Sequence, residues 1–135
     1  MKKAIALLLA LVMVFALCAC GGDKGTADNG EKVVKIGVFE PASGDSGAGG
    51  KKEMLGMQYA NQETPTVEIG GETYKVELVY SDNGSDSAKA VSAASKLVNE
   101  KVSIVLGSYG SGVSIAASDT FKQAGIPAVG VTCTN

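Results

Sequence analysis

The 135-residue sequence contains neither histidine nor arginine. Without histidine, a Ser-His-Asp relay cannot form within these residues, and histidine is excluded as a general base or metal ligand. The 12 lysines are outnumbered by 14 acidic residues, so the formal net charge is −2. Nucleic-acid binding requires clustered cations, which this balance does not supply. We therefore expect neither a nucleic-acid-binding protein nor an enzyme that relies on histidine.

Cysteine is scarce, and two of the three cysteines follow the longest hydrophobic run of the chain. Residues 4–17 form an unbroken apolar run behind Lys2 and Lys3, too short for a comfortable membrane span but suited to the core of a signal peptide. The segment L-C-A-C-G at residues 17–21 resembles the lipobox of bacterial lipoproteins. That resemblance implies cleavage before Cys20 and a lipid on its sulfur. An ordinary secretory signal with incidental cysteines is the alternative.

Three segments follow from this interpretation. They are a signal peptide at residues 1–19, a flexible tether at residues 20–32 and a folded domain at residues 33–135. The tether is rich in Gly, Asp and Lys and shows no apolar periodicity. With Cys20 acylated, Cys133 has no partner for an internal disulfide, so we predict that it is a small buried hydrophobe.

The predicted domain alternates between short apolar strands and amphipathic helices. Strands are expected at residues 33–39, 76–80, 104–106 and 128–131. One helix is expected to begin between residues 46 and 51 and to end at about residue 61. A second is expected after a cap at Ser85 or Asp86, as far as residues 99–100, and a third at residues 112–124. A Gly70-Gly71 pair between alternating residues predicts a β-hairpin at residues 66–76. This order predicts an α/β fold, an open parallel sheet with helices on both faces.

One polar loop, residues 107–112, joins a predicted strand to a predicted helix. The first N–H groups of that helix lack intrahelical partners and favour an anion. Tyr109 can form a flat apolar wall, and Gly110 lets a ligand approach the backbone closely. Ser111 can donate its hydroxyl hydrogen to a ligand.

A second polar segment follows the last predicted strand, where Thr132 and Thr134 offer hydroxyls and carbonyl oxygens. Open α/β sheets bind ligands beyond the carboxyl ends of their strands, so both loops are expected at one edge. Donors for a carboxylate and acceptors for an ammonium would then lie together, which suits the head of a free amino acid. Two alternatives require no ligand: Ser111 as a helix N-cap, and the two threonines as turn residues.

Two other kinds of site have less support. Neither glycine-rich loop, at residues 44–49 or 107–112, has the G-x-G-x-x-G order of a dinucleotide site. Asp82 and Asp86 are interpreted as turn and helix-cap carboxylates, because no third ligand for a cation follows at suitable spacing.

From residue 33 to residue 135 the sequence resembles the start of a type I periplasmic binding protein, of the leucine/isoleucine/valine-binding group of ABC transporters. The resemblance rests on K-I-G-V-F-E-P-A-S-G, A-V-S-A-A-S-K-L-V-N-E, V-L-G-S-Y-G-S-G-V-S-I-A-A and A-G-I-P-A-V-G-V-T-C-T-N, in this order. It implies that Ser111 binds the α-carboxylate of the ligand. It also implies that Thr132 and Thr134 contact the carboxylate and the ammonium.

The same resemblance implies that Ser43 and Gly44 line the ligand cleft. The family often has an aromatic residue further along this loop, and residues 45–50 contain none. The implied protein is a lipoprotein without cofactor or enzymatic activity, anchored through Cys20 to the outer face of the bacterial cell membrane. It would bind amino acids there and deliver them to ABC permease subunits.

Members of that family have two lobes that close on the ligand, and this sequence stops before the chain would cross to the second. We therefore expect the isolated chain to bind ligand weakly or not at all. An inactive truncated fragment and the ligand-sensing domain of a receptor are the alternative interpretations.

Overall fold

The computed structural model describes residues 31–134. The predicted signal peptide, Cys20 and all but the last two residues of the predicted tether lie outside the described residues. Within the described range, no helix is both long and apolar enough to cross a membrane.

A five-stranded sheet forms the middle layer, with strand order β2-β3-β1-β4-β5. Its strands are β1 (Val33–Val38), β2 (Thr66–Ile69), β3 (Glu72–Tyr80), β4 (Ile104–Leu106) and β5 (Ala128–Val129). Strands β3, β1, β4 and β5 run parallel. Strand β2 runs antiparallel to β3 through the predicted hairpin, where Gly70 and Gly71 both have positive φ, 62° and 82°. A two-residue hairpin loop of this kind favours glycine at both positions.

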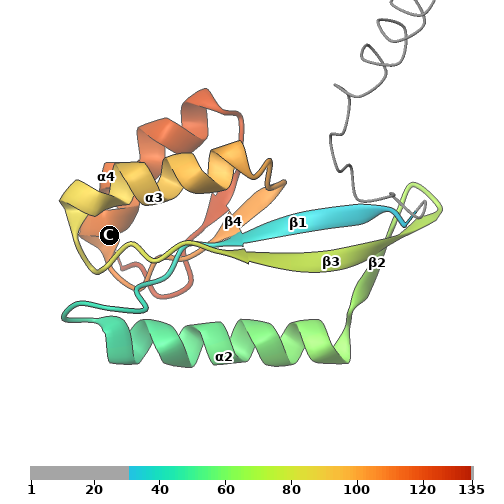
Figure 1. Ribbon diagram of the computed structural model, residues 1–135, viewed down its shortest axis with the longest axis horizontal. Coiled ribbons are helices and arrows are strands. Elements are labelled where there is room, and N and C mark those ends of the chain that lie inside the picture. The colour runs from blue at the N-terminus through green and yellow to red at the C-terminus, as the bar shows by residue number, and fades with distance from the viewer. Residues whose placement is uncertain (1–30, 135) are drawn as a thin grey trace, which may run out of the picture. The chain divides into compact units, whose positions relative to one another are not determined.

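Three helices cover the two faces of the sheet (Figure 1). Helix α2 (Gly47–Glu63) lies on one face, and helices α3 (Ser87–Asn99) and α4 (Ser111–Gln123) lie on the other. Asp86 caps α3, because its carboxylate accepts a hydrogen bond from the Ala88 N–H over 2.7 Å. The predicted parallel α/β sheet with helices on both faces is confirmed.

The hydrophobic core of the described residues lies between the sheet and the pair α3 and α4. It consists of Phe39, Ala90, Ala93, Ala94, Leu97, Val102, Val105, Val113, Ala117 and Phe121. The rings of Phe39 and Phe121 meet edge to face with centroids 5.5 Å apart, a favoured arrangement for aromatic pairs. This packing holds β1, β4 and α4 together, and these elements carry the two loops of interest.

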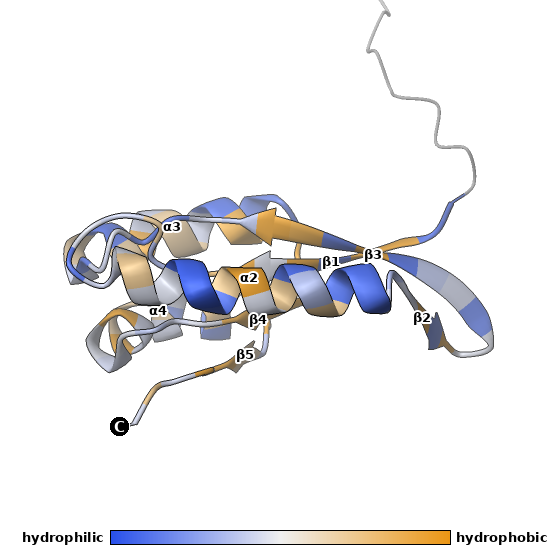
Figure 2. Ribbon diagram, turned by 90° about the horizontal axis from the view of Figure 1, so that it is seen from below, coloured by the Kyte–Doolittle hydropathy of each residue, from blue (hydrophilic) through white to orange (hydrophobic). Residues whose placement is uncertain are grey.

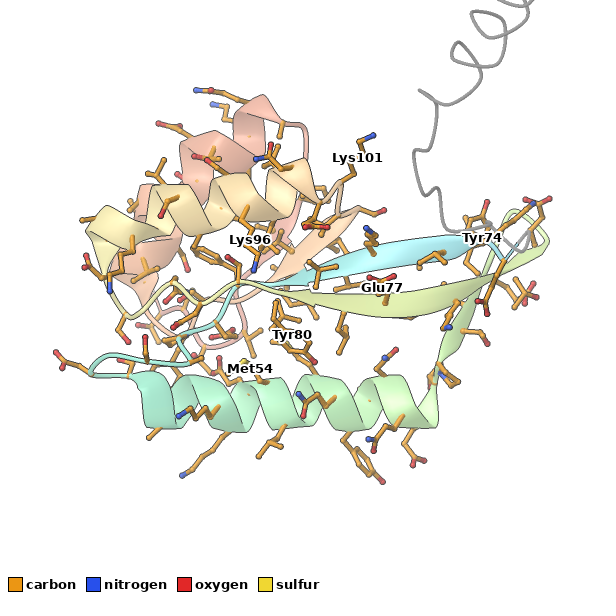
Figure 3. The ribbon with its side chains drawn as sticks, in the orientation of Figure 1. Met54, Tyr74, Glu77, Tyr80, Lys96 and Lys101 are labelled. Atoms are coloured by element: carbon orange, nitrogen blue, oxygen red, sulfur yellow. The ribbon has the colours of Figure 1, made fainter. Side chains whose placement is uncertain are left out.

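Helix α2 packs against the other face through far fewer buried residues. Its only buried residues are Gly47 and Gly50, while Leu55 and Tyr59 are 63% and 65% exposed. Met54 and Tyr80 lie between the helix and the sheet (Figure 3). The outer side of α2 alternates between hydrophilic and hydrophobic segments (Figure 2). A cavity of about 470 Å³ remains between this helix and the sheet, lined by apolar side chains such as those of Ile36, Leu78 and Leu106.

The last strand is shorter than predicted. The prediction covered residues 128–131, whereas β5 contains only Ala128–Val129. Val129 and Val131 are about half exposed, at 50% and 47%. The physical reason is that β5 is the edge strand of the described sheet and pairs only with β4, through two residue pairs.

Candidate functional site

The chain changes direction across the sheet between β1 and β4. From β1 it passes through α2 to β3, whereas from β4 it passes through α4 to β5 on the opposite side. Open α/β sheets bind ligands in the crevice at such a switch point, beyond the strand ends. The loops that follow these strands gather at one end of the sheet, where the described chain also ends (Figure 1). The candidate site therefore consists of the loops at residues 40–46, 107–110 and 130–134.

Four of the predicted site residues lie together at this edge: Tyr109, Ser111, Thr132 and Thr134. The Thr132 hydroxyl donates to the Tyr109 carbonyl oxygen over 3.3 Å. The Thr134 N–H donates to Ser111 Oγ over 3.1 Å. These contacts form because β4 and β5 are neighbouring parallel strands that end side by side. The two predicted loops thus meet, as their positions in the sequence indicated.

Ser111 is the first residue of α4 and not its cap. Gly110 occupies the N-cap position, and its own N–H donates to Ser108 Oγ over 3.2 Å. Because Ser111 Oγ accepts from Thr134, the serine keeps its hydroxyl hydrogen as a donor. The interpretation of Ser111 as only a helix cap is therefore wrong.

Ser43 lies in the loop after β1, and its hydroxyl is held by Asp82 in the loop after β3. Ser43 Oγ donates to Asp82 Oδ2 over 2.6 Å, and the Ala42 N–H donates to Oδ1 over 2.8 Å. The same carboxylate accepts from the N–H groups of Ser43 and Gly84. Desolvation opposes ionisation of Asp82, but these hydrogen bonds outweigh it and hold the pKa of the carboxyl below its usual value. Ser43 can therefore offer a ligand only its oxygen lone pairs.

Gly44 adopts positive φ, 75°, in the same loop and lies against the backbone of Gly84. A side chain at this position would collide with the Gly84 carbonyl group. The loops after β1 and β3 are therefore joined by direct backbone contact as well as through Asp82.

Two buried polar residues, Asn83 and Ser108, link the loops from inside and were not among the predicted site residues. Asn83 Nδ2 donates to the Phe39 carbonyl oxygen over 3.1 Å and to Ser108 Oγ over 3.2 Å. Both side chains are fully buried. A buried amide is stabilising only when it is hydrogen-bonded, so this pair fixes how the ends of β1, β3 and β4 approach. The local sequence around Asn83 reads as an ordinary turn, which is why sequence reasoning missed it.

Glu40, at the end of β1, is another residue that the sequence reasoning missed. Its side chain is 1% exposed, and its Oε2 accepts from the Tyr109 N–H over 2.8 Å. Burial, followed by the charge of Glu53 and a hydrogen bond with it, raises the pKa of Glu40 to about 8. The Tyr109 N–H opposes that rise. The only sequence signal was a carboxylate placed directly after a buried strand.

The Tyr109 side chain lies over the start of α2. A Cβ built on Gly49 would come within 2.6 Å of the tyrosine ring. The ring is nevertheless 42% exposed, so one side of it remains available as the predicted apolar wall. A residue larger than glycine at position 49 would displace this ring.

Cys133 differs from the prediction of a buried hydrophobe. The residue is half-buried, and its sulfur lies 3.0 Å from both the Ser108 carbonyl oxygen and Ser114 Oγ. The thiol thus takes part in the polar contacts of the loop, because β5 is too short to carry residue 133 into the core. Asp82 and Asp86 are turn and cap carboxylates, as interpreted, and the described residues contain no cluster of three potential metal ligands.

The fold and the position of these loops define a class of protein: an open α/β domain whose switch point is the candidate site for a small molecule. Residues 33–135 match the model of the family described as periplasmic binding protein, and the chain belongs to this family.

Among curated relatives, the chain is similar to the Leu/Ile/Val-binding protein homolog 2 of Brucella abortus. The two are 33% identical over 124 residues, which cover 92% of this chain but 32% of the relative. The chain therefore spans about a third of the length of that relative.

The chain is also similar to two solved structures. The leucine binding protein LivK of Thermotoga maritima is 36% identical with a TM-score of 0.70, covering 76% of this chain and 29% of the other. The branched-chain amino acid transporter substrate binding protein LivJ of Streptococcus pneumoniae, solved in complex with isoleucine, is 33% identical with a TM-score of 0.68. That match covers 77% of this chain and 30% of the other.

Proposed function

We propose that this chain supplies an amino-acid-binding edge of a substrate-binding lipoprotein, which serves an ABC importer and carries out no chemical conversion. The observation that carries the proposal is the meeting of Ser111, Thr132 and Thr134 at the adjacent ends of β4 and β5. The names of the relatives, and the isoleucine bound by one structural neighbour, support an amino acid with a branched apolar side chain as ligand.

The ligand carboxylate is assigned to the start of α4. The hydroxyl hydrogen of Ser111 and the first N–H groups of the helix are donors there, and the helix dipole adds favourable charge. Gly110 has no side chain that could block the approach of a ligand. The space beside it is also open, because the nearest atom to a Cβ built there is 3.8 Å away.

The ligand ammonium is assigned to acceptors on the opposite side of the head group. The Thr132 hydroxyl donates its hydrogen to Tyr109, so its oxygen remains an acceptor. The Thr134 carbonyl and hydroxyl and the Ser43 oxygen are further acceptors. The exposed side of the Tyr109 ring is assigned to the apolar part of the ligand.

The proposed place of work is outside the cell membrane. The apolar run at residues 4–17 and the lipobox-like segment ending at Cys20 support export, cleavage and lipid anchoring. Residues 20–32 would then act as a flexible tether that holds the folded part away from the membrane while it meets the permease.

Binding is tested by NMR titration of the ¹⁵N-labelled chain with leucine, which detects affinities into the millimolar range. We expect amide shifts that saturate and that concentrate at residues 109–112 and 132–134. Ser111→Ala is expected to weaken binding about tenfold or more, because a hydrogen bond to a charged group is lost. Ser118→Ala is the matched control, since this exposed serine on α4 bonds only to the Ile115 carbonyl of its own helix.

4-Methylpentanoic acid and 3-methylbutylamine, which keep the leucine side chain and each carry half of the head group, are expected to give much smaller shifts than leucine. Equal shifts for all three compounds, or leucine shifts that map elsewhere, would contradict the assigned site. The anchor is tested separately, by mass spectrometry of the protein produced in a bacterium. Diacylglycerol is expected on the wild type and on Cys18→Ala and absent from Cys20→Ala, and an unmodified wild-type Cys20 would refute the anchor.

A further inference from the structure

A buried pair of carboxyl groups lies under the loop that joins β4 to α4. Glu40 follows β1 and is 1% exposed, and Glu53 projects from α2. Oε1 of Glu40 and both carboxylate oxygens of Glu53 are buried, and no donor among the described residues reaches them. Two ionised carboxylates cannot share such a place without a cation, because both desolvation and mutual repulsion oppose it.

None of the salt bridges of the described residues involves Glu40 or Glu53. Strands β4 and β5 contain no ionisable side chain, and on β1 Lys35 pairs with Glu100, 3.7 Å away. Lys51 and Lys52 on α2 are exposed. Asp82, beyond β3, is hydrogen-bonded to the loop after β1 and would only add negative charge.

The Tyr109 phenol lies over Gly49, and Tyr80 packs between β3 and α2. A proton held between the two carboxyl groups would join one oxygen of each and remove the repulsion between two negative charges.

The pair is in direct contact with the proposed ligand loop. Glu40 Oε2 accepts from the Tyr109 N–H over 2.8 Å, and the carbonyl of the same tyrosine accepts from Thr132. Glu40 Oε1 also lies close under the backbone at Gly107, 2.5 Å from where a Cβ would stand. A movement of the Glu40 side chain away from this loop would therefore break its hydrogen bond with the Tyr109 N–H.

We propose that Glu40 and Glu53 share one proton at neutral pH, and that this shared proton positions the Tyr109 main chain for the ligand. When the proton is lost, two adjacent negative charges repel. This repulsion has to outweigh the hydrogen bond with the Tyr109 N–H, which by itself favours ionised Glu40, and it weakens the contact between the two residues. The loop then loosens, and the contact between Tyr109 and Thr132 loosens with it. The two residues are positioning residues, and the effect on affinity rests on the proposed function.

The sign of the pH dependence follows from the geometry and from the raised pKa of Glu40, about 8 against an ordinary 4.5. A carboxyl whose pKa is raised on folding contributes stability that is fully present below pH 4.5 and is lost as the pH rises through about 8. The loop is therefore expected to be ordered at neutral pH and looser at alkaline pH.

The test is an NMR titration of the full chain between pH 4 and pH 10. It follows the ¹³C shifts of the glutamate carboxyl groups and the ¹⁵N shift of Tyr109. We expect the Glu40 carboxyl to titrate near pH 8 and the Tyr109 amide to follow the same midpoint. Titration of the Glu40 carboxyl near its ordinary 4.5, or a Tyr109 amide shift that does not change with pH, overturns the proposal.

Glu40→Gln imitates the protonated state, because its amide oxygen accepts from Tyr109 while its NH₂ group donates to Glu53. This variant is expected to abolish the change of the Tyr109 amide shift at alkaline pH. Glu53→Gln should do the same by donating to Glu40, and it provides a second route if the first variant folds poorly. Glu63→Gln, an exposed position at the end of α2, is the matched control and should titrate like the wild type.

A leucine titration at pH 6.5 and pH 8.8 separates this proposal from the proposed function. The affinity of the wild type is expected to fall at least about threefold more between these pH values than that of Glu40→Gln. That comparison cancels the titration of leucine itself. If leucine binds neither the wild type nor Glu40→Gln, the proposed function fails. The proton-linked loop is then still tested by the pH dependence of the Tyr109 amide shift. If both proteins lose affinity equally, the link to binding is overturned.

Discussion

The two faces of the sheet differ in what they bury. The face covered by α3 and α4 buries a continuous apolar cluster around Leu97 and Val105, both 0% exposed. The face covered by α2 buries two glycines of that helix and a pair of carboxyl groups, and it leaves a cavity of about 470 Å³. Apolar burial is the main favourable term in folding, so the α3 and α4 side supplies most of the stability of the described residues.

The same difference separates stability from the candidate site. The α3 and α4 side fixes the directions of β1 and β4 through contacts such as that of Phe39 with Phe121. The α2 side meets the ligand loop through Glu40 and Gly49, where small changes in charge or volume act on Tyr109. Substitutions on the two sides should therefore have effects of different size and kind.

The largest expected contrast comes from one substitution made on each side. Leu97→Ala on α3 should lower the free energy of unfolding by about 2–5 kcal/mol, because it leaves a cavity in the core. Leu55→Ala on α2 should change it by no more than about 0.5 kcal/mol, since that side chain is 63% exposed. Urea unfolding followed by circular dichroism measures both. Equal losses of unfolding free energy would show that α2 contributes to a core as α3 does, which would contradict the difference between the two faces.

Two glycine-to-alanine substitutions should change the free energy of unfolding in opposite directions. A Cβ at Gly37 on β1 would lie 3.1–3.2 Å from Val105, Leu97 and Val102, so Gly37→Ala overpacks the α3 side and should cost about 1–3 kcal/mol. Gly56 on α2 has no atom within 4 Å of its Cβ position. Gly56→Ala should therefore stabilise the helix by about 0.5–1 kcal/mol. Thermal unfolding of the two variants checks the signs, and a stabilising Gly37→Ala would be the contrary result.

The smallest expected difference between two matched proteins concerns the hydrogen bonds that hold the loop after β1. Asp82→Asn should cost about 0.5–1.5 kcal/mol at pH 7, because the asparagine still accepts from the loop N–H groups but loses the charge. The pKa of Asp82 is lowered on folding, so its contribution is present above the ordinary value of 3.8 and is lost as the pH falls through the folded-state value.

The difference between Asp82→Asn and wild type should accordingly shrink on acidification below pH 3.8. Unfolding measured at several pH values between 2 and 7 gives this difference directly. Asp119→Asn, an exposed position on α4, is the control and should show no such trend. A difference that stays constant down to pH 2 would refute the role assigned to the Asp82 charge.

The order of the elements, the β-hairpin at Gly70-Gly71 and a cap of α3 at Ser85 or Asp86 could be predicted from the sequence, and the structure places the cap at Asp86. Each of these depends on interactions between residues close in the chain: the period of apolar residues, a turn that needs positive φ, and a carboxylate two residues before an N–H group. The sequence also predicted that Tyr109, Ser111, Thr132 and Thr134 gather at one edge, because carboxyl ends of parallel strands always meet there.

Which polar groups of these loops form hydrogen bonds with one another depends on the tertiary structure. Ser43 is held by Asp82, 39 residues away, and Asn83 by the Phe39 carbonyl, 44 residues away. Glu40 meets Glu53 because α2 folds back under the end of β1, while Glu40 also reaches Tyr109, 69 residues along the chain. Whether a polar side chain is buried, and whether it finds a partner there, depends on which strands become neighbours, and no local pattern contains that information.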